Sequence, residues 1–315
     1  MDKTDGNQMR NKYLYIILLS FIYSSAGASY EYGHSARSVS LSSSLVADNY
    51  NNLNSFINPA SLNQSKGKIY GLSYFIMSLD RSLQTFYYSQ KLAGNAGVSA
   101  AILRTSSGEF MGRDSFNNPT NELSNTEYYG LLSFGVGTKN GTGIGLSTRI
   151  HYSNLYVNEN HIDKYTGNSI TLDFGGIINI NPKWRIGFKF QNFLNPYLNW
   201  DIDRGDGLSN SYEEVYPSII SFGSMFNINQ NSKLFIQQDT YDKSKFNQTK
   251  IAYEYLGFDN FDLRCGYDFN KDITLGFGYN FYINQLPIIL DYAVDFGNQG
   301  EGLSHLFTWS IGLNE

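Results

Sequence analysis

Apolar side chains recur at every second position along most of this chain, in runs that are long for a β-sheet protein. Each run spans about 9–13 residues, against roughly 9–11 for a tilted strand that crosses a bilayer and about 5–6 for a typical soluble strand. The period of two and the length together predict membrane-crossing β-strands. Fourteen such segments follow one another: Ile69–Leu79, Leu83–Lys91, Gly97–Thr105, Thr126–Thr138, Thr142–Ser153, Asn168–Ile180, Trp184–Phe193, Ser218–Ile228, Lys233–Thr240, Gln248–Leu256, Phe261–Phe269, Ile273–Tyr282, Leu286–Asp295 and Leu303–Leu313.

The connections between these segments fall into two classes that alternate along the chain. Every second link is short, near Gly94, Lys139, Pro182, Gln230, Asp259 and Asn284. The other links include all the long ones: Ser106–Asn125, Asn154–Gly167, Leu194–Pro217, Tyr241–Asn247 and Phe296–Gly302. Short turns on one side and long loops on the other are typical of outer-membrane barrels, and an even strand number leaves no unpaired edge in lipid. We therefore predict an all-β fold, a transmembrane antiparallel β-barrel of about 14 strands with a short N-terminal plug.

The first residues predict export. Lys3, Arg10 and Lys12 precede an apolar run that is too short to span a bilayer, and Ala28 ends an Ala-x-Ala cleavage site. Met9 is an alternative start that would leave a compact basic region. We expect a signal peptide over 1–28, cleaved after Ala28, a hatch or plug segment over 29–66, and the barrel over 67–315 in the bacterial outer membrane.

The alternation also separates the two faces of the predicted wall. One face of the segments 168–193 and 261–281 is apolar, and the other carries charges. A charge that faces lipid costs roughly 2–4 kcal/mol near the midplane, so the charged face must line the lumen. We expect these side chains to line a wet lumen or to hold a plug through ion pairs. The lumen-facing candidates are Arg149, His151, Asp173, Arg185, Lys189, Lys250, Glu254, Asp262, Arg264 and Asp291.

The stretch from Phe134 to Tyr152 is unusually rich in glycine but does not form a phosphate-binding loop. Neither G-x-G-x-x-G nor Gly-Lys-Ser/Thr occurs in it. We predict a hairpin with a three-residue turn, Lys139-Asn140-Gly141, because a two-residue turn would pair lumen positions with lipid positions. In this register the glycines leave bare backbone on the lumen face, where plug residues 29–65 can pack. This patch consists of Gly135, Gly137, Gly143 and Gly145.

No residue pattern predicts catalysis, a metal site or a cofactor. His151 and Ser153 share the lumen face without a visible third member of a hydrolytic triad, so we interpret His151 as a lumen-lining residue. The four histidines lack the spacing of metal ligands. The acidic segment from Asn199 to Asp206 departs from a calcium loop because Arg204 stands at the glycine position, which leaves a weak surface site as an alternative. A net charge of −5 argues against nucleic-acid binding.

The polar segment SARSVSLSSSLVADNYNNLNSFINPASL ends in Asn58-Pro59-Ala60, where Asn58 suits a helix N-cap and Pro59 the first helical position. Together with the later motifs TLDFGGIINI, WRIGFKFQN and ILDYAVDFGNQGEGLSHLFTWSIGL, this segment resembles the FadL-like outer-membrane families. Within these families the PorV/PorQ branch is the most similar. Two features depart from the branch: Leu41-Ser42-Ser43 replaces a Met-Gly-Gly-like step, and the chain ends without a terminal aromatic residue.

This resemblance implies a hatch that carries Asn58, Pro59 and Ala60, and a non-enzymatic component of type IX-like protein secretion that docks or shuttles cargo. The implied partners are outer-membrane lipid, the barrel-assembly machinery, secretion-system subunits and exported cargo proteins. The alternative is a FadL-like channel for hydrophobic small molecules, and a third possibility is a structural or adhesive barrel. The charged lumen favours the secretion component over a channel with an apolar lumen.

Overall fold

The computed structural model describes residues 32–48, 55–114, 116–156, 164–194, 197–203, 209–242, 247–269, 273–297 and 302–313. Two short helices, α2 (Ala36–Ser40) and η3 (Pro59–Gln64), precede the sheet. No helix among the described residues is long and apolar enough to cross a membrane. The strands are β1 (Lys68–Ile76), β2 (Ser82–Leu92), β3 (Ala96–Arg113), β4 (Pro119–Gly137), β5 (Gly143–Tyr156), β6 (Lys164–Asn181), β7 (Trp184–Leu194), β8 (Tyr197–Asp203), β9 (Ser209–Val215), β10 (Ile219–Asn229), β11 (Ser232–Tyr241), β12 (Gln248–Tyr255), β13 (Phe261–Asp268), β14 (Ile273–Ile283), β15 (Leu286–Asp295) and β16 (Ser304–Leu313).

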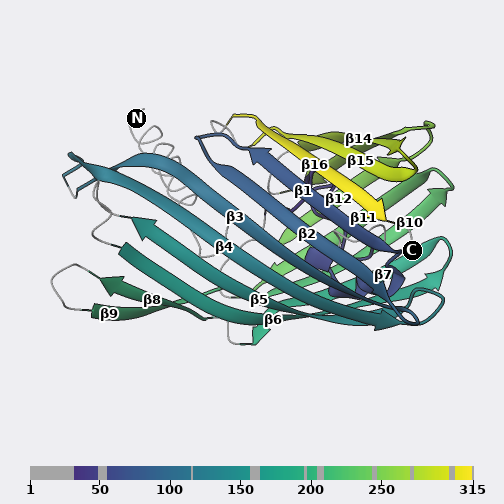
Figure 1. Cartoon of the computed structure of the whole chain (residues 1–315), viewed down its shortest axis with the longest axis horizontal. Coiled ribbons are helices and arrows are strands. Elements are labelled where there is room, and N and C mark those ends of the chain that lie inside the picture. The colour runs from purple at the N-terminus through teal and green to yellow at the C-terminus, as the bar shows by residue number, and fades with distance from the viewer. Residues whose placement is uncertain are drawn as a thin grey trace, which may run out of the picture.

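Fourteen of these strands form a closed antiparallel barrel (Figure 1). Strands β1 to β7 pair in chain order, β7 pairs with β10, and the order then continues to β16. Strand β16 closes the ring on β1, from Lys68 opposite Leu313 to Ile76 opposite His305. The predicted barrel of about 14 strands is confirmed, and it has no open edge within the ring.

The wall is taller on one side than the sequence predicts. The predicted loop Leu194–Pro217 contains the hairpin β8–β9, and β8 pairs with the far end of β6 over residues 164–168. The predicted loop Ser106–Asn125 is largely sheet, because β3 and β4 continue through it. Figure 1 shows β3–β6 and β8–β9 extending to the left beyond β1 and β16. The prediction relied on apolar side chains at every second position, a pattern expected only where a strand faces lipid. The strand extensions lack this pattern and are formed by backbone hydrogen bonds between neighbouring strands, so the sequence did not predict them.

The glycine-rich hairpin between β4 and β5 has the predicted register. Gly137 pairs with Gly143, Gly135 with Gly145, and Val136 with Ile144. Gly141 adopts a φ of 91°, which requires the freedom of glycine in the three-residue turn. The predicted turn is therefore confirmed.

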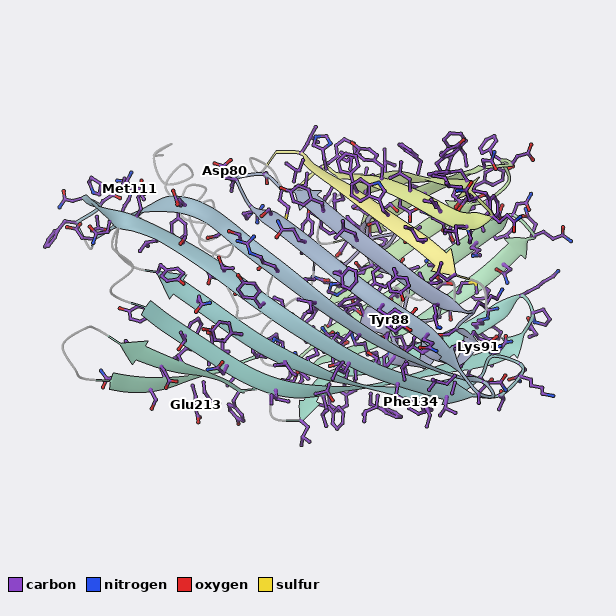
Figure 2. The ribbon with its side chains drawn as sticks, in the orientation of Figure 1. Asp80, Tyr88, Lys91, Met111, Phe134 and Glu213 are labelled. Atoms are coloured by element: carbon purple, nitrogen blue, oxygen red, sulfur yellow. The ribbon has the colours of Figure 1, made fainter. Side chains whose placement is uncertain are left out.

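Side chains alternate between an apolar outer surface and the barrel interior. Leu72 is 50% exposed, Ile102 61% and Leu132 57%, all on the outer face. Tyr88 and Phe134 project from the same surface in Figure 2. On β13, Leu263 and Cys265 are exposed while their neighbours Asp262 and Arg264 are buried. The packed core of the molecule thus lies inside the barrel, where the N-terminal segments fill the lumen.

Candidate functional site

Two N-terminal segments, residues 32–48 and 55–65, lie inside the barrel and are called the hatch here. Ser35 caps α2 through a reciprocal capping box with Ser38. Asn58 caps η3, since its Oδ1 accepts the Ala60 N–H at 3.0 Å, and Pro59 occupies the first position of the helix. Nearly every hatch side chain is buried, because the surrounding strands enclose it.

Asn58 also joins the two hatch segments to the barrel wall. Its Nδ2 lies 2.7 Å from the carbonyl oxygen of Val46 in the first segment. The same nitrogen lies 3.1 Å from the Gly176 carbonyl on β6 and 3.2 Å from the Phe188 carbonyl on β7. The side-chain amide of Asn58 therefore hydrogen-bonds to backbone carbonyl groups of both the hatch and the barrel wall.

A row of inward-facing glycines receives the η3 end of the hatch. Gly97, Gly135, Gly145 and Gly175 are paired across β3, β4, β5 and β6. A Cβ added at Gly145 would lie 2.4 Å from the carbonyl carbon of Pro59, and one at Gly135 would lie 2.4 Å from its oxygen. The missing side chains thus let hatch backbone lie directly on wall backbone.

The second pair of predicted patch residues faces a different hatch side chain. A Cβ at Gly143 would lie 2.1 Å from Nδ2 of Asn63, and one at Gly137 would lie 2.9 Å from the same atom. The Asn63 amide donates to the Gly141 carbonyl at 3.1 Å, in the turn itself. The structure thus places all four predicted patch glycines against residues 59–63.

Three of the predicted charged residues form one buried cluster beneath the hatch. Arg149 Nε lies 2.6 Å from Asp173 Oδ2, and Lys189 Nζ lies 3.7 Å from the same oxygen. Both cations also donate to the backbone carbonyl of Phe56 in the hatch, at 3.1 and 3.3 Å. The cluster therefore ties β5, β6 and β7 to the hatch.

A second buried network centres on Glu254 of β12. Arg37 of α2 binds its carboxylate with Nε and Nη2, each at 2.8 Å, and binds Asp48 at 2.8 Å. Arg264 Nε reaches Glu254 at 2.9 Å, and Lys233 lies 3.4 Å away. Arg264 further pairs with Asp291 at 2.5 Å and with Asp262 at 3.0 Å. The two-point contact of Arg37 is the main charged link between hatch and wall.

The remaining predicted residues occupy separate places. Lys250 pairs with Asp239 at 2.6 Å. Arg185 lies on β7 and is only partly buried. His151 is buried between the rings of Tyr129 and Tyr216, at centroid distances of 5.2 and 4.8 Å. Its Nε2 lies 3.4 Å from Thr171 Oγ1, so the ring serves as a packed wall residue in this structure.

The acidic segment considered as a calcium loop is not a loop where it is described. Asn199 and Asp201 lie in β8, opposite Asn168 and Thr166 of β6. Arg204, Asp206 and His161 lie outside the described residues, as does the predicted signal peptide. No group of three or more metal-ligating side chains occurs in the part of the chain that the structure describes.

Sequence reasoning missed an apolar cluster inside the long-loop end of the barrel, called the mouth cluster here. Its members come from α2, β1–β4, β8, the β9–β10 connection, β15 and β16. The sequence could have predicted this cluster, because its strand residues occupy lumen-facing positions. The lumen and lipid faces were, however, compared only for segments 168–193 and 261–281. The large members are Phe75, Leu83, Leu103, Tyr129, Leu198, Tyr216 and Leu306.

The interior therefore has two unlike walls. The buried inward-facing side chains of β1, β2 and β16 are apolar or carry hydroxyl groups, such as Ser73, Phe75 and Thr85. The ion pairs lie on β5–β7 and β11–β15. Of the two alternatives expected for the charged lumen face, a wet lumen or ion pairs that hold a plug, the structure fits the second, because these charges pair with one another and with hatch groups.

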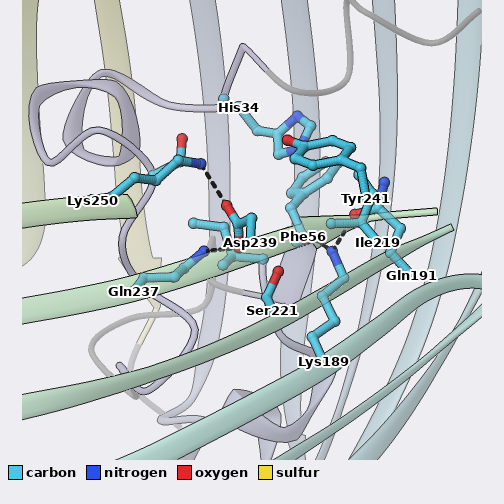
Figure 3. A pocket seen from close by; sticks show the side chains of 13 residues that line it. His34, Phe56, Lys189, Gln191, Ile219, Ser221, Gln237, Asp239, Tyr241 and Lys250 are labelled. Carbon is cyan, nitrogen blue, oxygen red and sulfur yellow. Dashed lines mark hydrogen bonds and ion pairs between the residues drawn. The ribbon is translucent and has the colours of Figure 1, made fainter. Parts of the chain in front are cut away.

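A small cavity of about 60 Å³ remains between the hatch and strands β7, β10, β11 and β12 (Figure 3). His34 and Phe56 border it from the hatch, with their rings stacked at 4.3 Å. Lys189, Asp239 and Lys250 border it from the wall. Burial, and then the positive charges of Arg149 and Lys189, hold the pKa of the His34 ring well below its usual value.

Comparison with solved structures identifies the fold. The Ralstonia pickettii toluene transporter TbuX matches with a TM-score of 0.65 and 11% identity, over 90% of this chain and 99% of that chain. The Pseudomonas putida toluene transporter TodX matches with 0.62 and 11%, over 90% and 99%. A Pseudomonas aeruginosa FadL homologue matches with 0.58 and 10%, over 89% and 98%. The chain therefore has a FadL-like β-barrel fold. No protein-family model matches the chain, and no curated protein matches its sequence.

These matches correct the function expected from the sequence. The expected role as a PorV/PorQ-like component of type IX secretion is wrong, because the matching structures are described as toluene transporters, hydrocarbon channels and a FadL homologue. The reasoning failed where it treated the whole lumen as charged. The alternative of a channel for hydrophobic small molecules fits these matches better.

Proposed function

We propose that this protein is a bacterial outer-membrane channel through which small hydrophobic molecules pass. The mouth cluster carries the proposal, because it places apolar side chains inside the barrel where a water-filled pore would have polar ones. The similar structures named as toluene transporters support it at the level of the fold. Secretion through a signal peptide and insertion by the barrel-assembly machinery remain part of this proposal.

The outer surface fits a lipid environment. Exposed aliphatic and aromatic residues cover the barrel strands, among them Phe86, Phe222 and Ile273, each more than half exposed. In water, a contiguous apolar surface of this kind would promote aggregation, whereas in a bilayer it contacts the hydrocarbon chains of the lipids. Outer-membrane lipid is therefore the first partner of the chain.

Inside, the mouth cluster offers an apolar molecule a favourable first site. Transfer of apolar surface out of water yields roughly 25 cal/mol per Å², and no lumen-facing charge lies among the cluster's members. The members of the cluster, among them Phe75, Leu103, Tyr129 and Val39 of α2, are buried against one another, so a ligand must displace some of these contacts. Movement at the top of the hatch and ligand binding are thereby coupled.

The charged residues serve the hatch in this proposal. Arg37, bound to Glu254, and the Phe56 carbonyl, bound by Arg149 and Lys189, hold the plug against the wall. A plug held in this way excludes water and ions while the apolar end of the barrel stays available. The uncharged wall would select the substrate and the charged wall would retain the plug.

Binding to the mouth cluster can be tested with a matched pair of variants. We expect Leu103→Asn to weaken binding of a lipophilic fluorescent probe to the purified protein about tenfold or more, since a buried amide costs roughly 1–3 kcal/mol. Leu303→Asn makes the same change at a half-exposed connection outside the cluster and should leave binding unchanged. Equal probe affinity in both variants and the wild type would contradict the proposed function. Uptake of labelled toluene by cells that express each variant should follow the same order.

A further inference from the structure

The β8–β9 hairpin, which extends the wall beside the far end of β6 (Figure 1), has an inner face that continues the mouth cluster. Leu198 of β8 belongs to this cluster, and Trp200 packs against it. Glu214 of β9 lies opposite Leu198, and directly opposed residues of an antiparallel pair share one face of the sheet. Tyr212 lies opposite Trp200 and is 62% exposed, so this face is accessible. These four residues are called the extension face here.

The Glu214 carboxylate is held by an aromatic donor and has no cation beside it. The indole Nε1 of Trp200 donates to its Oε2 at 3.0 Å. Within the described residues Glu214 forms no ion pair, and its second oxygen accepts no hydrogen bond. An ionised carboxylate has acceptor sites on both oxygens, so this group retains capacity for a donor that a ligand supplies.

The surrounding strands supply no basic side chain to the extension face. Strands β4, β8 and β9 contain neither lysine nor arginine. The one such residue of β5 is Arg149, which binds Asp173 deeper in the barrel. The one such residue of β6 is Lys164, whose register position opposite Asp203 belongs to the outward face.

The other interior cations near the long-loop end have acidic neighbours of their own. Arg81, in the β1–β2 connection across the mouth, lies beside Tyr32 together with Asp295. The two lysines of the cavity next to His34 lie deeper and face carboxylates on neighbouring strands: Lys189 faces Asp173, and Lys250 faces Asp239 and Asp268. None of these cations compensates Glu214 at contact distance.

A second carboxylate acts on the same part of the mouth. Glu127 of β4 lies opposite the buried Ser153 of β5, so it also faces the interior. Burial, and then neighbouring tyrosine and glutamate side chains with Glu127 and Glu214 among them, raise the pKa of the Tyr216 hydroxyl. Both carboxylates therefore contribute to a negative potential at the entrance to the mouth cluster.

A buried hydroxyl group next to the extension face also lacks a partner. Ser169 of β6 faces the interior and is 5% exposed, and its Oγ has no hydrogen-bond partner in the described part of the chain. The pairing of β6 with β8 reaches Asn168, so Ser169 adjoins Leu198 and lies on the same level as Glu214. A buried hydroxyl without a partner is costly, and its lone pairs can accept an N–H from a ligand.

We propose that the extension face binds an organic ammonium ion, so that hydrophobic amines are a substrate class of the channel. This inference rests on the proposed function and adds the charge of the substrate to it. The ammonium group pairs with Glu214, lies against the rings of Trp200 and Tyr212, and has the Ser169 hydroxyl as a second acceptor. Its apolar tail continues over Leu198 into the mouth cluster.

The same groups disfavour an acid. A hydrophobic carboxylate would bring a negative charge toward Glu214 and Glu127, and no cation on the extension face would receive it. A neutral hydrocarbon can enter the mouth cluster but gains nothing from Glu214. The affinity for an amine, relative to that for a hydrocarbon of the same shape, therefore measures the contribution of this site.

The test compares ligands that differ in charge but share a phenyl group and a short chain. They are 4-phenylbutylammonium, n-pentylbenzene, in which a methyl group replaces the ammonium, and 4-phenylbutanoate. Equilibrium dialysis measures their binding to the purified full chain in a non-ionic detergent at neutral pH and about 0.15 M salt, against protein-free micelles. We expect the wild type to bind the ammonium at least about tenfold more tightly than the carboxylate. Glu214→Gln should lower the ratio of ammonium to pentylbenzene affinity about tenfold, because a charge-assisted hydrogen bond becomes a neutral one.

The adjacent glutamate of β9 provides a matched control. Glu213 lies opposite Asn199 on the outward face, so Glu213→Gln removes the same charge from the other side of the sheet. It should change the affinity ratio less than about twofold, because salt screens a charge that faces solvent. Heat-dependent migration on denaturing gels should be the same in the wild type and both variants, which would establish that the barrels are folded.

An affinity ratio that is unchanged in Glu214→Gln, or that falls equally in Glu213→Gln, would overturn the inference. So would a wild type that binds the carboxylate as tightly as the ammonium. In each of these cases pentylbenzene still binds, and the proposed function stands. Failure of the wild type to bind pentylbenzene would instead contradict the proposed function, so the two failures are distinguishable.

Discussion

His34 is a titratable residue of the hatch whose pKa is lowered by its surroundings. It is buried, stacks on Phe56, and lies near Arg149 and Lys189 of the wall, with Asp239 and Lys250 across the cavity. Sequence reasoning treated it as one of four scattered histidines, because nothing in its neighbourhood along the chain indicates that two cations from β5 and β7 converge on it. The partners of a plug residue come from strands more than a hundred positions away, and no local pattern records them.

The low pKa of His34 makes docking of the hatch depend on pH. The docked ring binds fewer protons than the released ring, so docking is fully stable above the ordinary histidine pKa of about 6.5 and weakens as the pH falls below it. The slope is at most about 1.4 kcal/mol per pH unit for one group. We expect protease cleavage of the hatch to increase between pH 7 and pH 5 in the wild type. The increase should be smaller in His34→Phe, which keeps the stacking but cannot be protonated, and equal pH profiles would rule this explanation out.

At the scale of elements, the β4–β5 hairpin shows what strand parity predicts well. Each residue has only two possible faces, so a single constraint, that lipid positions must pair with lipid positions, determined the turn length and the glycine register. The same logic predicted the number of barrel strands. It failed for β8–β9 and the far ends of β3 and β4, because strands that leave the bilayer need no apolar face.

The glycine row can be tested by two matched substitutions on adjacent strands. Gly145→Ala places a Cβ 2.4 Å from the Pro59 carbonyl carbon, a backbone atom that cannot rotate away, whereas the nearest atom to a Cβ at Gly130 is 3.7 Å away on Ile150. We expect Gly145→Ala to destabilise the docked hatch by roughly 1–3 kcal/mol, the usual cost of overpacking. Gly130→Ala should be neutral or slightly stabilising, since alanine loses less backbone entropy than glycine in a strand. The effect is measured as the protease sensitivity of the hatch. Similar sensitivity in both variants would show that η3 does not pack against Gly145.

For the whole molecule, the structure separates the ring that forms the barrel from the hatch that fills it. The barrel closes through β1 and β16 and depends on no hatch residue for its strand pairing. The buried networks, by contrast, need the hatch: Arg37 binds Glu254 from α2, and the Phe56 carbonyl accepts from Arg149 and Lys189. The alternation of the sequence predicted the ring, because each strand carries its own lipid-facing pattern. It could not predict which hatch groups meet which wall charges, since these partners come from segments that lie far apart in the chain.

Deleting residues 29–65 should therefore convert the closed barrel into an open, ion-conducting pore. A barrel of 14 strands is wider than the 8-stranded barrels that side chains can fill and approaches the 16–18-stranded porins, which enclose water. Without the hatch, Glu254, Asp173 and their cation partners would face this water, so their burial would no longer oppose ion passage. We expect stable conductance steps in planar bilayers for the truncated chain and none for the full chain. Heat-dependent migration on denaturing gels, shared by both proteins, would establish that the barrel is folded. A folded truncated barrel that conducts no ions would mean that the wall closes the lumen by itself, and the plug would then have no role in the permeability of the channel.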